Sequence, residues 1–209
     1  GAAGDMTVTA ETLILEGTAP LNVWQVLISN SIPTWLDPLG KVTDLVIDAG
    51  GKSNIVKYTD EEQVVFVLEG TGILIYGKEK VPVSKNDFMY IPVGTRYGFS
   101  NTREKPLSVI VMGFKIMAGT VIKPTTKLMI ANADEVSFQI LGSHGPTTQF
   151  QLLMGTTEST RDRIASAYQV NSLFVMDFAV NGTNIPHRHD KEEEIYFIMT
   201  LILGSRSMR

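Results

Sequence analysis

Residues 45–68 read LVIDAGGKSNIVKYTDEEQVVFVL, and they align without gaps with residues 176–199, which read MDFAVNGTNIPHRHDKEEEIYFIM. Each copy starts with an apolar run, turns at a Gly-containing pair and passes through a second short run. Each then crosses an acidic turn and ends in an apolar, β-branched run. The pattern predicts strand, Gly turn, strand, acidic turn and strand twice, so we expect an all-β fold with an internal duplication.

The rest of the chain follows the same pattern of short strands. Between residues 43 and 115, β-branched and apolar runs alternate with turns rich in Gly, Pro, Asn and Asp. This spacing is typical of a β-sandwich or barrel. The next segment carries Gly119 and Pro124 and loses the alternation. We therefore expect an N-terminal barrel at residues 1–116, a linker at 117–135 and a second unit at 136–209.

The composition excludes several classes of function. The 209 residues include 18 Lys and Arg against 22 Asp and Glu, which gives a formal net charge of -4, and they contain no basic run. Nucleic acid and anionic membranes are therefore poor partners. The absence of cysteine excludes disulfides, thiolate nucleophiles and sulfur-ligated zinc or iron–sulfur sites. No apolar run is long enough to span a bilayer, so we expect a soluble protein, with the cytoplasm slightly favoured.

Two of the three histidines, His187 and His189, stand one residue apart, and Glu194 follows them across the acidic turn. Residues two apart on a strand point to the same face. Two imidazoles and a carboxylate that converge in this way suit Fe(II), Mn(II), Zn(II) or Ni(II). The alternative is a pair of surface histidines beside a solvated acidic turn. The third histidine, His144, is interpreted as a loop residue, and an additional metal ligand is its alternative role.

With these motifs and the repeat, the chain resembles the cupin superfamily, and within it the two-domain bicupins. The first cupin motif runs Gly, five residues, His-x-His, three or four residues, Glu, six residues, Gly. The second motif runs Gly, five residues, Pro-x-Gly, two residues, His, three residues, Asn. The N-terminal unit keeps the frame of both motifs at Gly50, Gly70, Pro92, Gly94 and Asn101. The resemblance implies a double-stranded β-helix, the jelly-roll barrel of the cupins, present twice.

In the N-terminal unit the four positions that bind metal in the family hold Val56, Tyr58, Gln63 and Tyr97. Val has no donor atom, and Gln and Tyr are poor ligands for a divalent ion, so we expect no metal in this barrel. Tyr58, Gln63 and Tyr97 are instead predicted to line the barrel and to bind a small ligand. Their alternative role is that of core polar groups that satisfy one another.

In the C-terminal unit, His187, His189 and Glu194 match three of the family's four ligand positions, which implies one divalent ion, Mn, Fe, Zn or Ni. The sequence continues from Glu194 only to Arg209, without a second motif or a fourth ligand. We therefore expect an incomplete second barrel. Three interpretations stay open: a truncation, completion by another subunit, or a half-unit that packs on the first barrel. Because half a barrel exposes strand edges, we also expect a homodimer.

The resemblance implies a metal-dependent protein that acts on a small polar molecule. The main hypothesis is an enzyme of the dioxygenase, decarboxylase or isomerase type, with an organic acid or a sugar derivative as substrate. The alternative is a non-enzymatic small-molecule-binding or storage-type bicupin. The family hosts many activities on one fold, so the sequence leaves open whether the chain is an enzyme and identifies no catalytic residue.

Overall fold

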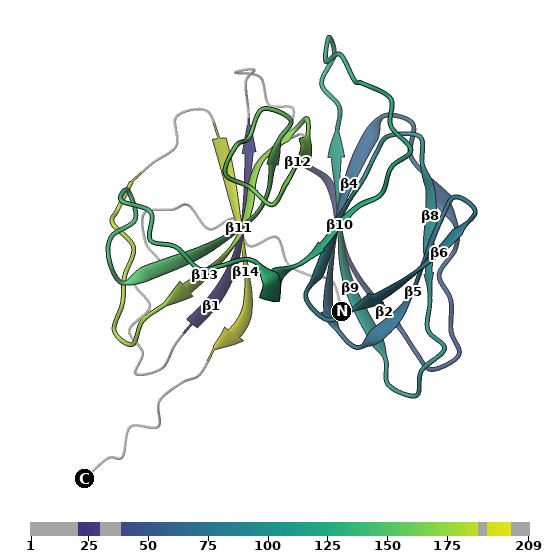
Figure 1. Ribbon diagram of the computed structural model, residues 1–209, viewed down its shortest axis with the longest axis horizontal. Coiled ribbons are helices and arrows are strands. Elements are labelled where there is room, and N and C mark those ends of the chain that lie inside the picture. Colours follow the sequence, from purple (N-terminus) through teal and green to yellow (C-terminus); the bar gives the residue numbers. More distant parts are fainter. Residues whose placement is uncertain (1–20, 30–38, 188–191, 202–209) are drawn as a thin grey trace.

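The computed structural model describes residues 21–29, 39–187 and 192–201, which form three β-sheets (Figure 1). Sheet A contains β12 (Ile164–Ala167), β11 (Thr148–Thr156), β13 (Val170–Phe178), β1 (Leu21–Ser29) and β14 (Glu192–Leu201), in this spatial order. Sheet B contains β10 (Met129–Asn132), β7 (Asp87–Ile91), β4 (Glu61–Glu69), β9 (Leu107–Lys115) and β2 (Leu39–Ile47). Sheet C contains β3 (Val56–Lys57), β8 (Arg96–Ser100), β5 (Thr71–Tyr76) and β6 (Glu79–Ser84).

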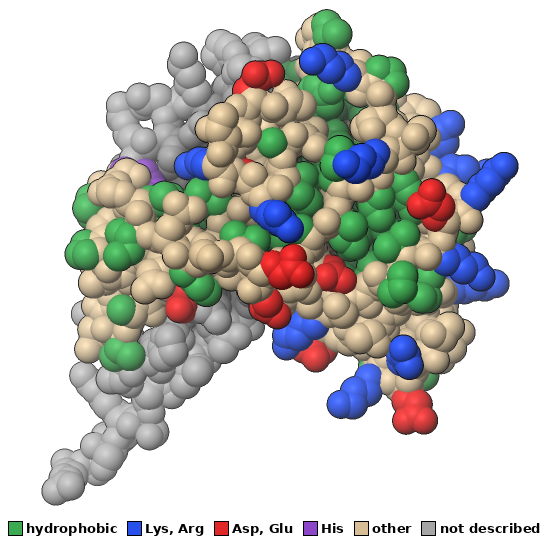
Figure 2. All heavy atoms as spheres, viewed as in Figure 1, with side chains coloured by type: hydrophobic (Ala, Val, Ile, Leu, Met, Phe, Trp, Pro, Cys, Tyr) green, Lys and Arg blue, Asp and Glu red, His purple; other side chains and the backbone are tan. Residues whose placement is uncertain are grey.

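These strands confirm the all-β prediction. The helical content of the described residues is one short 3-10 helix, η1 (Ala133–Glu135), whose first turn is capped by the Asn132 side chain. Within the same ranges, no helix has the length and apolarity needed to cross a membrane. On the face shown in Figure 2, Lys and Arg side chains are interspersed with Asp and Glu side chains.

Strand β4 explains the architecture, because its apolar run is buried on both sides. Val65 and Val67 face one core and Val64 and Phe66 face another. A strand that is half exposed alternates apolar and polar residues, whereas a strand covered on both faces is continuously apolar. Sheet B is therefore the middle layer of the molecule.

Three hydrophobic clusters separate the layers. The first fills the barrel between sheets B and C and includes Val65, Leu74, Met89, Phe99 and Val109. The second lies between sheets B and A and includes Phe66, Phe88, Ile110, Leu153, Leu173 and Val175. The third covers the far face of sheet A and includes Phe150, Leu152, Phe174 and Met176, with Tyr196 packed against it. We call this face of sheet A, which is opposite to the face that packs on sheet B, the inner face of the second unit.

The sequence repeat is visible in the register of the sheets. Strands β4, β9 and β2 neighbour one another in sheet B, as do β14, β1 and β13 in sheet A. Gln63 and Lys41 flank Gly113 on its two sides, and at the aligned positions of the second unit Glu194 and Ser172 flank Leu27 in the same way. The duplicated pattern thus places equivalent residues in equivalent rows.

Two strands join sheets outside the unit to which the sequence assigned them. Strand β1 comes from the range 1–116, yet it lies between β13 and β14 in sheet A. Strand β10 comes from the expected linker and pairs with β7 at the edge of sheet B. The N-terminal segment therefore contributes a strand to the interior of the second unit's sheet.

A buried carboxylate joins the two units. Glu62 lies on the face of β4 that meets sheet A, and its Oε2 accepts from Tyr90 Oη at 2.9 Å and from the backbone N–H of Tyr168 at 2.9 Å. Its Oε1 accepts from the backbone N–H of Gln169 at 2.8 Å. Burial raises the pKa of Glu62 more than these donors lower it. Both oxygens are thus used to fix the turn before β13 against sheet B.

Candidate functional site

The structure brings the predicted ligand-binding residues of the first barrel together. Tyr97 Oη donates to Gln63 Oε1 at 3.4 Å, and Gln63 Nε2 donates to Glu61 Oε2 at 3.1 Å. Tyr97 and Gln63 are buried, and Tyr58 packs against the same core. These side chains therefore lie together in the barrel interior. Ligand binding by them stays a prediction.

The side chains of this polar chain form hydrogen bonds with one another. Burial raises the pKa of Tyr97, and the nearby Tyr58 and Glu61 raise it further, so the phenol remains a hydrogen-bond donor. Gly113 on β9 makes room for the chain, because a Cβ there would lie 3.0 Å from Gln63 Nε2. Two of the four positions that bind metal in the family, Gln63 and Tyr97, are thus joined to each other by a hydrogen bond.

The predicted metal ligands of the second unit are described to different extents. The side chain of His187 is described, whereas His189 lies outside the described residues. Glu194 is placed through its backbone in β14, opposite Leu27, and its side chain is not described. Within the side chains that the structure describes, no three His, Asp or Glu groups are clustered as metal ligands.

His187 is oriented by its own loop. Its Nδ1 lies 2.8 Å from the carbonyl O of Ile185, which can only accept a hydrogen bond. Nδ1 therefore carries the proton, and Nε2 is the atom with the lone pair in the neutral ring. This tautomer is the one that a histidine needs to bind a metal through Nε2.

His144, interpreted from the sequence as a loop residue with a metal ligand as its alternative role, lies beside His187. The two rings are 4.8 Å apart between centroids, at 88°, and His144 also contacts the ring of Phe150 at 4.6 Å. His144 Nδ1 lies 3.0 Å from Asn184 Oδ1, an acceptor, which assigns the proton to Nδ1 and the lone pair to Nε2 in this ring as well. His144 stands well before the second copy of the repeat, and no spacing rule connects such a loop to the histidine motif.

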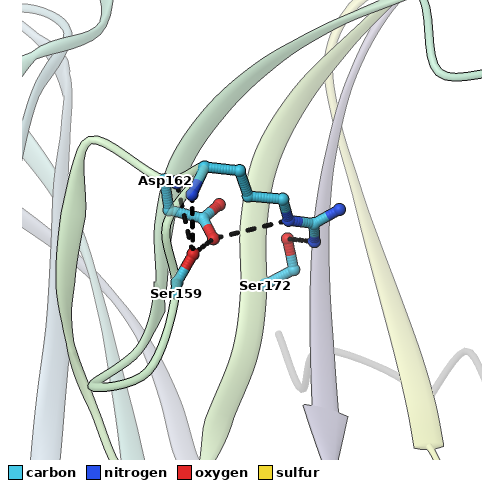
Figure 3. Close-up of polar contacts among 4 residues, drawn as sticks. Ser159, Asp162 and Ser172 are labelled. Carbon is cyan, nitrogen blue, oxygen red and sulfur yellow. Dashed lines mark hydrogen bonds and ion pairs between the residues drawn. The ribbon is translucent and has the colours of Figure 1, made fainter.

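A third polar group stands at the end of β11, where the sequence predicted no site. The Ser159 hydroxyl donates to Asp162 Oδ2, and Arg161 Nε lies 3.5 Å from the same oxygen. Arg161 Nη2 donates to Ser172 Oγ on β13 at 3.1 Å. Figure 3 shows Ser159 and Asp162 turned toward each other beside the strand that carries Ser172. The group thus ties the β11–β12 loop to the inner face of sheet A.

Comparisons with known proteins agree with the barrel. Residues 44–113 match the sequence model of the cupin domain. An uncharacterized protein of Methanocaldococcus jannaschii is 27% identical over 73 residues, which are 35% of this chain and 58% of that protein. The match thus spans less than two thirds of that relative.

Solved structures of other proteins resemble the chain as well. A protein from Pseudomonas aeruginosa named for glyoxylate induction shares the fold, with a TM-score of 0.51 at 10% identity, over 90% of this chain and 85% of its own. A predicted oxalate decarboxylase from Thermotoga maritima is 16% identical, with a TM-score of 0.37, over 38% of this chain and 69% of its own. From the match at residues 44–113 and the barrel that they form, this part of the chain is a cupin domain.

Proposed function

We propose that this chain is a bicupin whose second unit binds one divalent ion, Mn, Fe, Zn or Ni, through His187, His189 and Glu194. Two imidazoles and a carboxylate are a ligand set that these ions accept. The first barrel then serves as a structural or ligand-binding unit, because its polar interior is already hydrogen-bonded.

The observation that carries the proposal is the hydrogen bond from His187 Nδ1 to the carbonyl of Ile185. Metal-binding histidines are held in this way, with the non-binding ring nitrogen donating to an oxygen of the protein. The bond fixes both the tautomer and the orientation of the ring. A surface histidine beside a solvated turn needs no such support.

His144 is included in the proposal as a further ligand. Two imidazoles that share one ion at about 2.1 Å through Nε2 have centroids about 4.6 to 5.3 Å apart for bond angles near 90 to 110°. The distance between the His144 and His187 centroids, 4.8 Å, lies in this range. His144 would supply the imidazole that cupins otherwise take from their second motif.

The expected activity is that of a metal-dependent enzyme of the dioxygenase, decarboxylase or isomerase type. A bound divalent ion supplies Lewis acidity to an oxygen of the substrate. The chain itself supplies an apolar floor, formed by Phe150, Leu152, Phe174 and Met176, that keeps water away from one side. We expect a small polar organic acid or a sugar derivative as substrate.

The second candidate function is non-enzymatic binding of a small molecule. It is favoured by the first barrel, where Tyr97 and Gln63 are enclosed without any metal-binding side chain at the four family positions. The two functions differ in their need for metal. A measurement of the metal content of the chain therefore distinguishes the two functions.

The test is the metal content of the purified chain by elemental mass spectrometry, before and after reconstitution. We expect about one equivalent per chain, its loss in His187→Ala and Glu194→Ala, and its retention in Glu193→Ala as the matched control. His144→Ala is expected to weaken binding in a competition with a metallochromic dye. A wild-type chain without metal after reconstitution would exclude the proposed metal site and leave the binding function.

We also propose that the chain forms a homodimer through β14. Among the strands that the structure describes, this strand is the last in the order of sheet A, and Phe197 on it is 38% exposed. An exposed edge strand with apolar side chains favours pairing with another chain. Size-exclusion chromatography with light scattering at several concentrations tests this, and a monomer at all of them would contradict it.

A further inference from the structure

The β11–β12 loop contains a carboxylate that is buried at some cost. The Asp162 side chain is 1% exposed, and its Oδ1 has no hydrogen-bond donor within the described residues. The Asp162 carboxylate lies directly over Gly155 of β11, where a Cβ would come within 2.8 Å of Asp162 Cγ. Burial of a charged group destabilises the fold unless the charge is paired with a group of opposite charge. Here that group is the neighbouring guanidinium.

Arg161 is held on two sides and open on the others. Asp162 Oδ2 lies 3.5 Å from Nε, and Ser172 Oγ accepts from Nη2 at 3.1 Å. A guanidinium has five N–H donors, so among the contacts of the described residues Nη1 and the second N–H of Nη2 remain. The side chain is 51% exposed. The remaining donors form a fork that matches the two oxygens of a carboxylate.

Ser172, which accepts a hydrogen bond from the fork, lies in the same row as the proposed metal ligand Glu194. Ser172 pairs with Leu27, and Leu27 pairs with Glu194 on its other side. Neighbouring strands are about 4.8 Å apart, so the backbones of Ser172 and Glu194 are about 10 Å apart. A molecule of a few carbon atoms spans that interval. Ser172 also shares the inner face with Phe174, two residues further along β13.

We infer that Arg161 binds the carboxylate of a small organic acid on the inner face of the second unit, with Asp162 and Ser172 positioning the guanidinium. The inference rests on the proposed function for the location of the substrate. It narrows the substrate to acids and excludes neutral sugar derivatives, which offer no anionic group to the fork.

The experiment is calorimetric titration of the full chain with malonate, and with malonamide as its uncharged analogue. Arg161→Gln is compared with Arg163→Gln. Arg163 is 54% exposed, lies two residues away and pairs instead with Glu135 at 3.6 Å. Each protein is tested metal-free and metal-loaded, and its metal content and melting temperature are recorded.

We expect malonate to bind the wild type at least tenfold more tightly than malonamide. Arg161→Gln is expected to weaken malonate binding about tenfold or more, as for the loss of a charge-assisted hydrogen bond. Arg163→Gln should stay within twofold, and Arg161→Lys should recover part of the affinity.

Equal affinity of wild type and Arg161→Gln, or an equal loss in Arg163→Gln, would overturn the inference, as would a wild type that binds no malonate. If the chain binds metal but its affinity for malonate does not depend on Arg161, this inference alone is overturned. Malonate binding that depends on Arg161 in a chain without metal would overturn the proposed metal site alone.

Discussion

Gly155 is the residue on which the Arg161 group is built. It pairs with Ser172 inside sheet A, and the absence of a side chain leaves room for the Asp162 carboxylate. Any Cβ at this position would displace a side chain that is buried and hydrogen-bonded to Ser159. Because Asp162 contacts Arg161, the absence of a side chain at Gly155 also determines how the Arg161 guanidinium is oriented.

We predict that Gly155→Ala lowers the free energy of unfolding by about 1 to 3 kcal/mol, the usual effect of forcing extra volume into a packed site. Gly142→Ala is the matched control, because nothing lies within 4 Å of the position that its Cβ would occupy. The control should change stability by less than about 0.5 kcal/mol. Urea unfolding measures both, and equal effects would show that Asp162 can move aside.

The positions of some candidate residues in the fold could be predicted from the sequence, and the positions of others could not, for a physical reason. Gln63 and Tyr97 were predictable, because the strand pattern and the family frame place both inside one barrel. The His-x-His spacing singled out His187, whose role as a metal ligand stays a prediction. His144 and Arg161 come from loops whose positions depend on tertiary packing. Nothing in the local sequence tells a loop residue which strand it will contact.

At the scale of the element, strand position explains where proline is accepted. Pro82 lies in β6, the last strand in the order of sheet C. An edge strand leaves alternate N–H groups unpaired, so a proline there costs no ladder hydrogen bond. In β1, by contrast, Val26 pairs with Leu173 on one side and with Ile195 on the other.

Val26→Pro is therefore expected to lower the free energy of unfolding by about 3 kcal/mol or more, because it removes a hydrogen bond in the interior of sheet A. Lys80→Pro is the matched control, since Lys80 has the same alternation as Pro82 in the edge strand. Urea unfolding with hydrogen exchange of β13 measures the difference. A larger loss in Lys80→Pro would contradict the placement of β1 within the sheet.

The fold was predictable at the level of strands and their repeat, but not at the level of sheet membership. The apolar run of β4 and the Gly turns indicate strands from local chemistry alone. The location of β1 in sheet A does not follow from local chemistry, because its partners β13 and β14 come from the opposite end of the sequence. Unit boundaries drawn along the sequence therefore differ from the units in space.

At the scale of the whole molecule, Glu62 makes the joint between the units sensitive to pH. Its ordinary pKa is near 4.5, and burial raises the pKa in the folded state. The folded chain then binds the proton more tightly than the unfolded chain. This contribution to stability is complete below the ordinary pKa and is lost as the pH rises through the folded-state pKa.

We predict that Glu62→Gln lowers the free energy of unfolding by about 1 to 3 kcal/mol, because its amide N–H group meets backbone N–H donors. The difference from the wild type should be larger at pH 4 than at pH 7, since glutamine does not titrate. Glu69→Gln is the control with opposite sign, because the hydrogen bond from Lys85 lowers the pKa of Glu69. Urea unfolding at several pH values tests this, and parallel curves for Glu62→Gln and wild type would contradict it.

The insertion of β1 between β13 and β14 also has a consequence during synthesis on the ribosome. The β1 strand, Leu21–Ser29, is translated long before its first partner, β13, which begins at Val170. At about 5 to 20 residues per second this interval lasts about 7 to 28 s. The first barrel can fold during this interval, but β1 has no partner strand until β13 has been synthesised. For that time an apolar strand is available to chaperones, or to another nascent chain on the same message.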